Sequence, residues 1–184
     1  AVYVISRISG EGADRKAVPG DYYLSGQEKD ELEKIFSLYE KVIVVLNTGG
    51  IIDLSFMDNK NKGALVVMSQ AGMEGGNALA DVLLGRVNPC GKLTDTWARG
   101  YEDYPSSKNF SHNNGNIIEE KYEDGIYVGY RYFDSFDVKP RYCFGYGLSY
   151  TSFAIKTESV KVKENRVELL FSVKNTGPVA GREV

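Results

Sequence analysis

The apolar residues of the chain follow, in turn, the spacing of strands and of helices. Residues 1–5 are a short apolar run rich in β-branched and aromatic side chains, which predicts a strand buried on both faces. Ser25 and Glu28 have the spacing of a capping box, so a helix is expected to begin there and to end near Lys41. Its apolar stripe consists of Leu32, Ile35, Phe36 and Tyr39.

Two further apolar runs, at 42–47 and 64–68, predict strands separated by a turn at Gly49–Gly50. Strands that alternate with helices indicate a parallel sheet with crossover helices. The next crossover helix is expected after Gly72, with a stop at Gly85. The apolar positions at helical spacing in this segment are Ala78, Leu79, Val82 and Leu83.

The period changes to two after Phe153. Apolar and polar residues alternate on both sides of Glu164–Asn165, which predicts a hairpin of an antiparallel sandwich. Residues 91–150 have no clear period and are rich in aromatic side chains, so we expect loops there, where site residues often lie. The apolar positions of the hairpin are Val160, Val162, Val167, Leu169, Phe171 and Val173.

These patterns predict an α/β fold, with a mostly parallel sheet sandwiched by helices, followed by the first strands of an antiparallel β-sandwich. The expected domains are residues 1–152 and residues 153–184. The chain begins directly in a β-branched run and ends within a β pattern. We therefore expect a piece of a larger protein, incomplete at the N-terminal side of the α/β domain and truncated in the β-sandwich.

Composition and charge exclude several classes of function. With 42% hydrophobic, 26% charged and 12% aromatic residues, the chain has the composition of a folded globular protein. Its net charge is −3 with both signs interspersed, so nucleic acid is not an expected partner. No run reaches the roughly 18 apolar residues that span a bilayer, so no membrane segment is expected.

Metal or cofactor chemistry has no support in the sequence. Cys90 and Cys143 lack the spacing of metal ligands, and the single histidine, His112, lies in a polar stretch typical of a solvated loop. We expect two reduced thiols, which is typical of a cytoplasmic protein, and neither a bound metal nor a cofactor.

The segment Ser9-Gly10-Glu11-Gly12 is the strongest candidate site. It follows the first strand, and open α/β sheets bind ligands at the carboxyl ends of their strands. A carboxylate between two glycines lets a substrate approach closely, although spacing alone also fits an exposed loop glutamate or a phosphate-binding turn. The GxGxxG and GxxxxGK[ST] patterns of phosphate loops are absent. Asp14 and Arg15 are expected to hold the loop by local ion pairs or hydrogen bonds.

Five blocks of sequence, in order, cover nearly the whole chain and resemble the C-terminal half of glycoside hydrolase family 3. This family includes many β-glucosidases and β-xylosidases. The blocks are SGEGADR, VIVVLNTGG, GMEGGNALADVLLGRVNPCGKL, GIYVGYRYFD and CFGYGLSYTSF.

The resemblance implies a three-part enzyme, in which a barrel domain carries an aspartate nucleophile and a fibronectin-III-like domain packs beside the α/β sandwich domain. The glutamate of SGEG, here Glu11, is implied to be the general acid/base of a retaining exo-β-glycosidase, with Ser9 as a candidate substrate contact. Such enzymes need two carboxyl groups roughly 5–5.5 Å apart, and the proton donor needs a raised pKa. No segment resembles the barrel, so the chain alone is expected to be inactive on β-linked oligosaccharides or glycosides.

A noncatalytic carbohydrate-binding or scaffolding module is the alternative function. It would need an aromatic platform for sugar rings that is independent of Glu11. Such a platform could involve Trp97, although a core position is the more common role for tryptophan. The other candidates, for which packing is also the more common role, are Tyr127, Tyr130, Tyr132 and Phe133.

Overall fold

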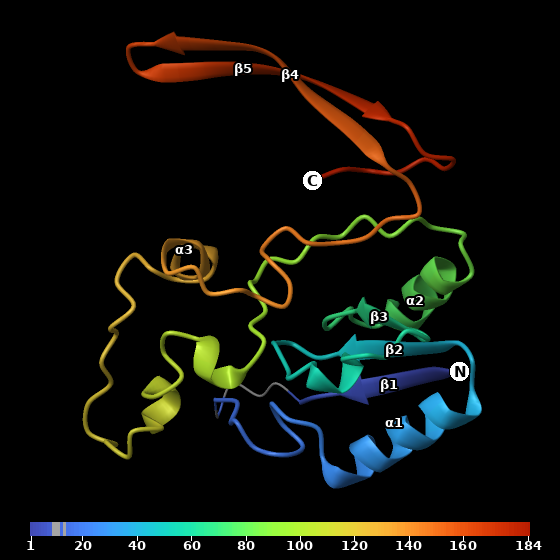
Figure 1. The fold of residues 1–184 in the computed structure, drawn as a ribbon, viewed down its shortest axis with the longest axis vertical. Coiled ribbons are helices and arrows are strands. Elements are labelled where there is room, and N and C mark those ends of the chain that lie inside the picture. The colour runs from blue at the N-terminus through green and yellow to red at the C-terminus, as the bar shows by residue number, and fades with distance from the viewer. Residues whose placement is uncertain (9–11, 13) are drawn as a thin grey trace. The chain divides into compact units, whose positions relative to one another are not determined.

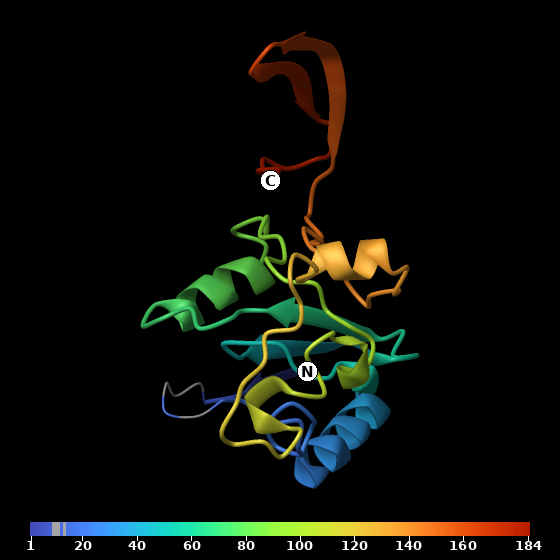
Figure 2. The same cartoon turned by 90° about the vertical axis from the view of Figure 1, so that its left-hand side faces the viewer.

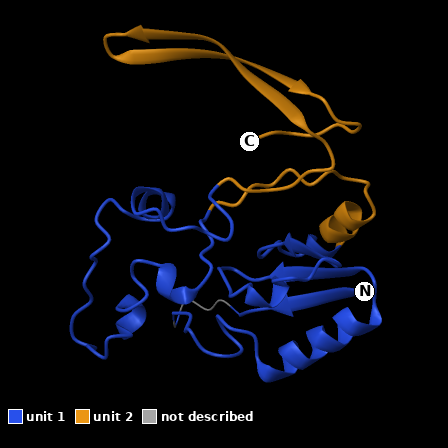
Figure 3. Ribbon diagram, in the orientation of Figure 1, with its two compact units in different colours: residues 1–76, 95–144 blue, residues 77–94, 145–184 orange. Residues whose placement is uncertain are grey.

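The computed structural model describes residues 1–8, 12 and 14–184 of the chain (Figure 1; a perpendicular view is shown in Figure 2). It divides into two compact units, which Figure 3 shows in different colours. Unit 1 consists of residues 1–76 and 95–144, and unit 2 of residues 77–94 and 145–184. Both units are therefore assembled from two separate stretches of the chain, while the expected domain boundary after residue 152 stays a prediction.

Unit 1 contains a parallel sheet of three strands in the order β1-β2-β3, which confirms the expected α/β class. The strands are β1 (Val2–Ser6), β2 (Val42–Asn47) and β3 (Gly63–Val67). Helix α1 (Gly26–Leu38) connects β1 to β2 and lies beside β1 in both views (Figures 1 and 2). Between β2 and β3 the described chain has only a short 3₁₀ turn, η1 (Ser55–Met57), so a full crossover helix is absent from that connection.

The central strand β2 forms the middle of the core because it pairs with a strand on each side. Its residues Val44, Val45 and Leu46 are completely buried. Each side chain that leaves water in this way contributes about 1.5–3 kcal/mol. The surrounding core residues with less than one-tenth of their surface exposed include Ile5, Leu24, Leu32, Phe36, Ile52, Leu54, Trp97 and Phe133.

Helix α1 begins as the sequence predicts. The Ser25 side chain accepts a hydrogen bond from the Glu28 N–H, and the Glu28 carboxylate accepts one from the Ser25 N–H, which completes the capping box. The helix ends at Leu38, shortly before the expected Lys41, because Tyr39 adopts an extended conformation and is half-exposed. The inner face of α1 therefore depends on Leu32 and Phe36 rather than on the whole predicted stripe.

Strand β1 is an edge strand, and the prediction that both its faces are buried is wrong for the described structure. Val2 and Val4 are about half exposed, at 53% and 49%, whereas Ile5 is 1% exposed. The inner face of β1 is covered by α1, where the Tyr3 hydroxyl donates to Glu31 at 2.6 Å. A run of β-branched residues shows that a strand forms, but not whether another layer covers its second face.

Helix α2 (Gly75–Leu83) ends as predicted, with Gly85 at a φ of +71° and its N–H donating to the Val82 carbonyl at 3.0 Å. Glycine adopts this left-handed conformation without steric cost, which is why it stops the helix. In the described chain, however, no further parallel strand follows α2. The expectation that α2 is a crossover helix is therefore wrong, because the chain continues through loops and short helices.

The aromatic-rich stretch of unit 1 forms the expected loops, and these contain three short helices that the sequence does not predict. These are η2 (Tyr101–Asp103), η3 (Phe110–His112) and α3 (Tyr130–Ser135). Trp97 is 4% exposed and its backbone N–H donates to the Tyr142 carbonyl at 2.9 Å, while Phe133 is 2% exposed. The core interpretation is thus confirmed for Trp97 and Phe133.

Unit 2 contains the predicted hairpin, formed by β4 (Phe153–Lys163) and β5 (Arg166–Asn175). Lys163 pairs with Arg166, so the two residues between the strands are Glu164 and Asn165, as expected. A register shift between Thr157 and Ser159 interrupts the ladder. No described helix is long and apolar enough to cross a membrane.

Candidate active site

The SGEG motif follows β1 directly, but only its last residue, Gly12, is described. Ser9, Gly10 and Glu11, like Ala13, lie outside the described residues, so the structural account of the site rests on the two flanks of the motif. One flank is Arg7, whose backbone N–H donates to the Asn47 carbonyl at 3.2 Å and extends the β1–β2 pairing. The other is the returning segment 14–25.

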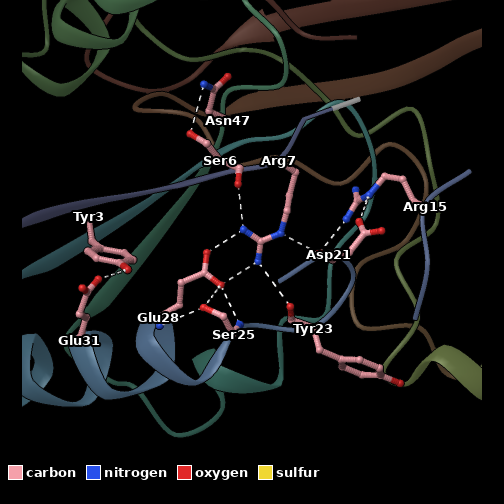
Figure 4. Close-up of polar contacts among 10 residues, drawn as sticks. All are labelled: Tyr3, Ser6, Arg7, Arg15, Asp21, Tyr23, Ser25, Glu28, Glu31 and Asn47. Carbon is pink, nitrogen blue, oxygen red and sulfur yellow. Dashed lines mark hydrogen bonds and ion pairs between the residues drawn. The ribbon is translucent and has the colours of Figure 1, made fainter. Parts of the chain in front are cut away.

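The Arg7 side chain joins these flanks (Figure 4). Its Nε donates to the Asp21 carbonyl at 2.7 Å, and its Nη1 donates to the Ser6 carbonyl at 2.8 Å. The same guanidinium pairs with both oxygens of Glu28, at 2.7 Å and 3.0 Å, and makes a longer contact of 3.5 Å with the Tyr23 carbonyl. Only 5% of the Arg7 side chain is exposed. Its buried guanidinium links β1, the returning segment and α1 by hydrogen bonds.

Glu28 serves both the helix cap and Arg7. Burial by itself raises the pKa of this carboxyl, but the hydrogen bonds from Arg7 and Ser25 outweigh burial and leave the pKa below its usual value of 4.5. The carboxylate is therefore charged at neutral pH. Because the folded state favours the charged carboxylate, Glu28 stabilises the fold above about pH 4.5. This contribution to the free energy of unfolding is lost as the pH falls through the lowered pKa.

We expect the Glu28→Gln variant to be about 1.5–3 kcal/mol less stable at neutral pH, since hydrogen bonds to charged groups contribute about that much. The difference from the unchanged protein should shrink as the pH falls below about 4.5, because the native carboxyl then takes up a proton. Urea unfolding at a series of pH values measures this. Glu164→Gln, at the exposed hairpin turn, is the control, and a constant difference for Glu28→Gln across the acid range would contradict the assignment.

Arg15 makes the local ion pair that the sequence predicts, and its partner is Asp21 in the returning segment. Its Nε donates to the Asp21 carboxylate at 2.6 Å, and its Nη2 donates to the Asp21 carbonyl at 2.9 Å. Nη1 reaches the Ile51 carbonyl beyond β2 at 3.2 Å. Burial raises the pKa of Asp21, while the Lys16 N–H and Arg15 lower it more, so the net shift is downward. Both arginines thus donate to one carbonyl, that of Asp21.

An open cavity of about 410 Å³ lies beside this segment in unit 1. Its lining includes Arg15, Lys16, Gly50, Ile51, Tyr22 and Tyr101. The rings of Tyr22 and Tyr101 meet edge to face, with centroids 5.2 Å apart. Burial raises the pKa of Tyr22 well above its usual value, so its hydroxyl stays neutral. The lining thus combines aromatic rings with polar and charged side chains.

The described residues contain no group of histidine, cysteine and acidic side chains that could hold a metal ion. Cys90 and Cys143 are both free thiols. His112 makes local contacts, with its Nδ1 2.7 Å from the Asn116 carbonyl and 3.1 Å from the Glu120 carboxylate. The histidine thus belongs to a half-exposed loop rather than to the flanks of the motif.

Arg7 and the second role of Glu28 are not predicted by the sequence pattern. The pattern predicts Glu28 only as a helix cap and does not single out Arg7. A signal was available, because an arginine directly between a strand and a glycine-rich segment is well placed to bind backbone carbonyls. What the sequence does not reveal is that the chain returns to Arg7 at Asp21 and Tyr23.

A comparison with known families identifies the chain. A family model described as the glycosyl hydrolase family 3 C-terminal domain matches residues 1–150. The chain belongs to glycoside hydrolase family 3. The resemblance noted from the five blocks is thereby confirmed.

Relatives in family 3 are similar over most or all of the chain. A β-glucosidase from Ruminococcus albus is 44% identical over 185 residues, which cover 100% of this chain and 19% of the relative. β-Glucosidase A from Butyrivibrio fibrisolvens is 40% identical over 182 residues, covering 85% of this chain and 22% of the relative. The chain thus spans about a fifth of these relatives.

Solved structures in family 3 share the fold. β-Glucosidase 3B from Thermotoga neapolitana, in complex with glucose, superposes with a TM-score of 0.91 at 44% identity, over 98% of this chain and 26% of that chain. A β-glucosidase from Kluyveromyces marxianus in complex with glucose gives a TM-score of 0.85 at 30% identity, over 96% of this chain and 20% of that chain. The α/β sheet and the antiparallel hairpin are therefore those of family 3 enzymes.

Proposed function

We propose that the chain is the acid/base-carrying part of a retaining, exo-acting β-glycosidase, with β-glucosides as its substrate class. In this proposal Glu11 protonates the departing glycosidic oxygen and then activates water, and Ser9 contacts the substrate. The aspartate nucleophile belongs to a barrel domain in another part of the same enzyme. Residues 1–152 form the α/β sandwich domain, and residues 153–184 begin the fibronectin-III-like domain.

The observation that carries the proposal is the position of the SGEG motif within a family 3 chain. The motif follows β1 directly, and its described flanks, Arg7 and the returning segment 14–25, are joined through Asp21 and Glu28. A general acid must be held within hydrogen-bond reach of the oxygen that it protonates. A glycine-flanked glutamate whose neighbouring segments are fixed by buried hydrogen bonds meets that requirement better than an unsupported surface loop does.

One part of the enzyme should be inactive by itself, because the two catalytic groups are proposed to lie in different domains. Retaining hydrolysis requires two carboxyl groups on opposite sides of the scissile bond, roughly 5–5.5 Å apart. Glu11 supplies only the proton donor in this proposal. The nucleophile and most sugar contacts must come from the barrel domain, which is thus the expected partner of this chain.

An activity assay with and without the barrel portion tests the proposal. We expect no hydrolysis of aryl β-glycosides by the chain alone, and turnover when the chain is co-expressed with the barrel portion of its own enzyme. A panel of glucoside, xyloside and galactoside substrates should show preference for the glucoside. Turnover by the chain alone would refute the assignment of the nucleophile to the barrel domain. A reconstituted complex that binds sugars without cleaving them would favour the noncatalytic carbohydrate-binding alternative.

A further inference from the structure

We propose that Arg7 is a positioning residue for the general acid. Its side chain joins the two flanks of the SGEG motif, the end of β1 and the returning segment 14–25, and we call this junction the neck. This inference rests on the proposed function of Glu11. It concerns a residue that does not touch the substrate and acts through the hydrogen bonds shown in Figure 4.

The neck is formed by residues that are distant along the chain. Arg7 lies at the end of β1, whereas the carbonyls of Asp21 and Tyr23 and the carboxylate of Glu28 come from the returning segment and from α1. A single planar guanidinium bridges all of them, with five donors in a fixed arrangement. Because Arg7 is itself anchored to β2 through its backbone N–H, the neck is fixed to the sheet.

The returning segment 14–25 also has hydrogen bonds that do not involve Arg7. The Asp21 carboxylate accepts from the Lys16 N–H at 2.6 Å, and the Gly20 N–H donates to the Tyr23 carbonyl at 2.8 Å. Arg15 connects the same segment to the Ile51 carbonyl. We therefore expect the segment to keep its local shape without Arg7, and Arg7 to determine where the segment lies relative to β1.

A displacement at the neck should affect proton transfer more than nucleophilic attack. Misplacing a catalytic group by about 1 Å can lower a rate about a hundredfold. The nucleophile is proposed to lie in another domain, so its attack does not depend on this neck. Loss of Arg7 should therefore act selectively on substrates whose leaving group needs a proton.

The test compares two β-glucosides in the complete enzyme. An alkyl glucoside requires protonation of its leaving oxygen, whereas a dinitrophenyl glucoside departs without it, and kcat/KM reports bond cleavage for both. We expect Arg7→Gln to lower kcat/KM about ten- to a hundredfold for the alkyl glucoside and less than about twofold for the dinitrophenyl glucoside. An equal loss on both substrates, or no loss on either, would overturn the inference.

Two further variants separate positioning from stability. Arg7→Gln leaves the partly buried Glu28 carboxylate without its cation, which destabilises the fold, and the double variant with Glu28→Gln removes that charge. We expect the double variant to have a higher melting temperature than Arg7→Gln but the same selective loss on the alkyl glucoside. Recovery of the alkyl activity together with the melting temperature would mean that Arg7 acts through stability alone.

A matched control exists in the same unit. Arg141 makes a similar two-point ion pair with Asp58, at 2.6 Å and 3.2 Å, and its side chain is 11% exposed. This pair bonds to no part of the neck, so Arg141→Gln should lower the melting temperature without changing the ratio of kcat/KM on the two substrates. If Arg141→Gln changes that ratio as much as Arg7→Gln does, the selective role of Arg7 is refuted.

Glu11→Ala, measured in parallel, distinguishes the two proposals. If Glu11→Ala slows the alkyl glucoside selectively and Arg7→Gln does not, the inference about Arg7 fails while the proposed function stands. If Glu11→Ala shows no selective effect, the proposed function fails and the inference about Arg7 fails with it.

Discussion

The Glu11→Ala variant of the complete enzyme should lose about 10²–10⁴-fold in kcat/KM on alkyl β-glucosides, the range that general acid catalysis typically contributes. The alkoxide leaving group of such a substrate cannot depart without a proton. On a dinitrophenyl glucoside, which departs as a stable anion, kcat/KM should change little. This contrast between substrates identifies a lost proton donor rather than a general loss of structure.

The second half of the reaction provides an independent readout. Without the base that activates water, the glycosyl-enzyme intermediate should accumulate and kcat should fall even on the dinitrophenyl glucoside. Azide, a small nucleophile that needs no base, should restore turnover and yield a glucosyl azide. Glu164→Ala, at the hairpin turn, is the matched control, and its kcat and kcat/KM should equal those of the wild-type enzyme. Equal losses on both substrates, without azide rescue, would contradict the role of Glu11.

Leu46→Ala should destabilise unit 1 by about 3 kcal/mol, within the range of about 2–5 kcal/mol observed for buried leucines. Leu46 is 0% exposed and lies in β2 opposite Ile5 of β1 and Val67 of β3. Its truncation leaves a void on the face of the sheet, beside the side chains of its two strand partners, that cannot easily close. Since folded domains have only about 5–15 kcal/mol of stability, this one change removes a large share.

Urea unfolding followed by circular dichroism measures the change in stability. Leu38→Ala is the matched control, because Leu38 is 66% exposed at the end of α1. Its effect should stay within about 0.5 kcal/mol, as for most surface substitutions. A similar shift for both variants would show that β2 is not the centre of the core.

The regular elements could be predicted from the sequence because each has a signal contained within a short window. The capping box of Ser25 and Glu28 and the stop at Gly85 are set by backbone groups a few residues away. The hairpin around Glu164–Asn165 follows from an alternation that fits only a strand with two different faces. The SGEG motif is likewise local, and the five blocks sufficed to suggest the family that the comparisons confirm.

Burial and partnership could not be predicted in this way, because they depend on what the rest of the chain places against a residue. The apolar run at Val2 and Val4 predicts a strand, yet whether its second face is covered depends on a further layer. The stripe of α2 predicts a helix, but not whether a parallel strand follows it. The candidate site shows the same limit, since its anchors come from three separate segments.

Local backbone preferences and the spacing of side chains are enough to predict the elements of this protein, its SGEG motif and its family. The contacts of Arg7 with Asp21, Tyr23 and Glu28, and of Arg15 with Ile51, can be seen only in the folded chain. A guanidinium binds whichever acceptors folding brings within about 3 Å, and that distance has no counterpart in the order of residues.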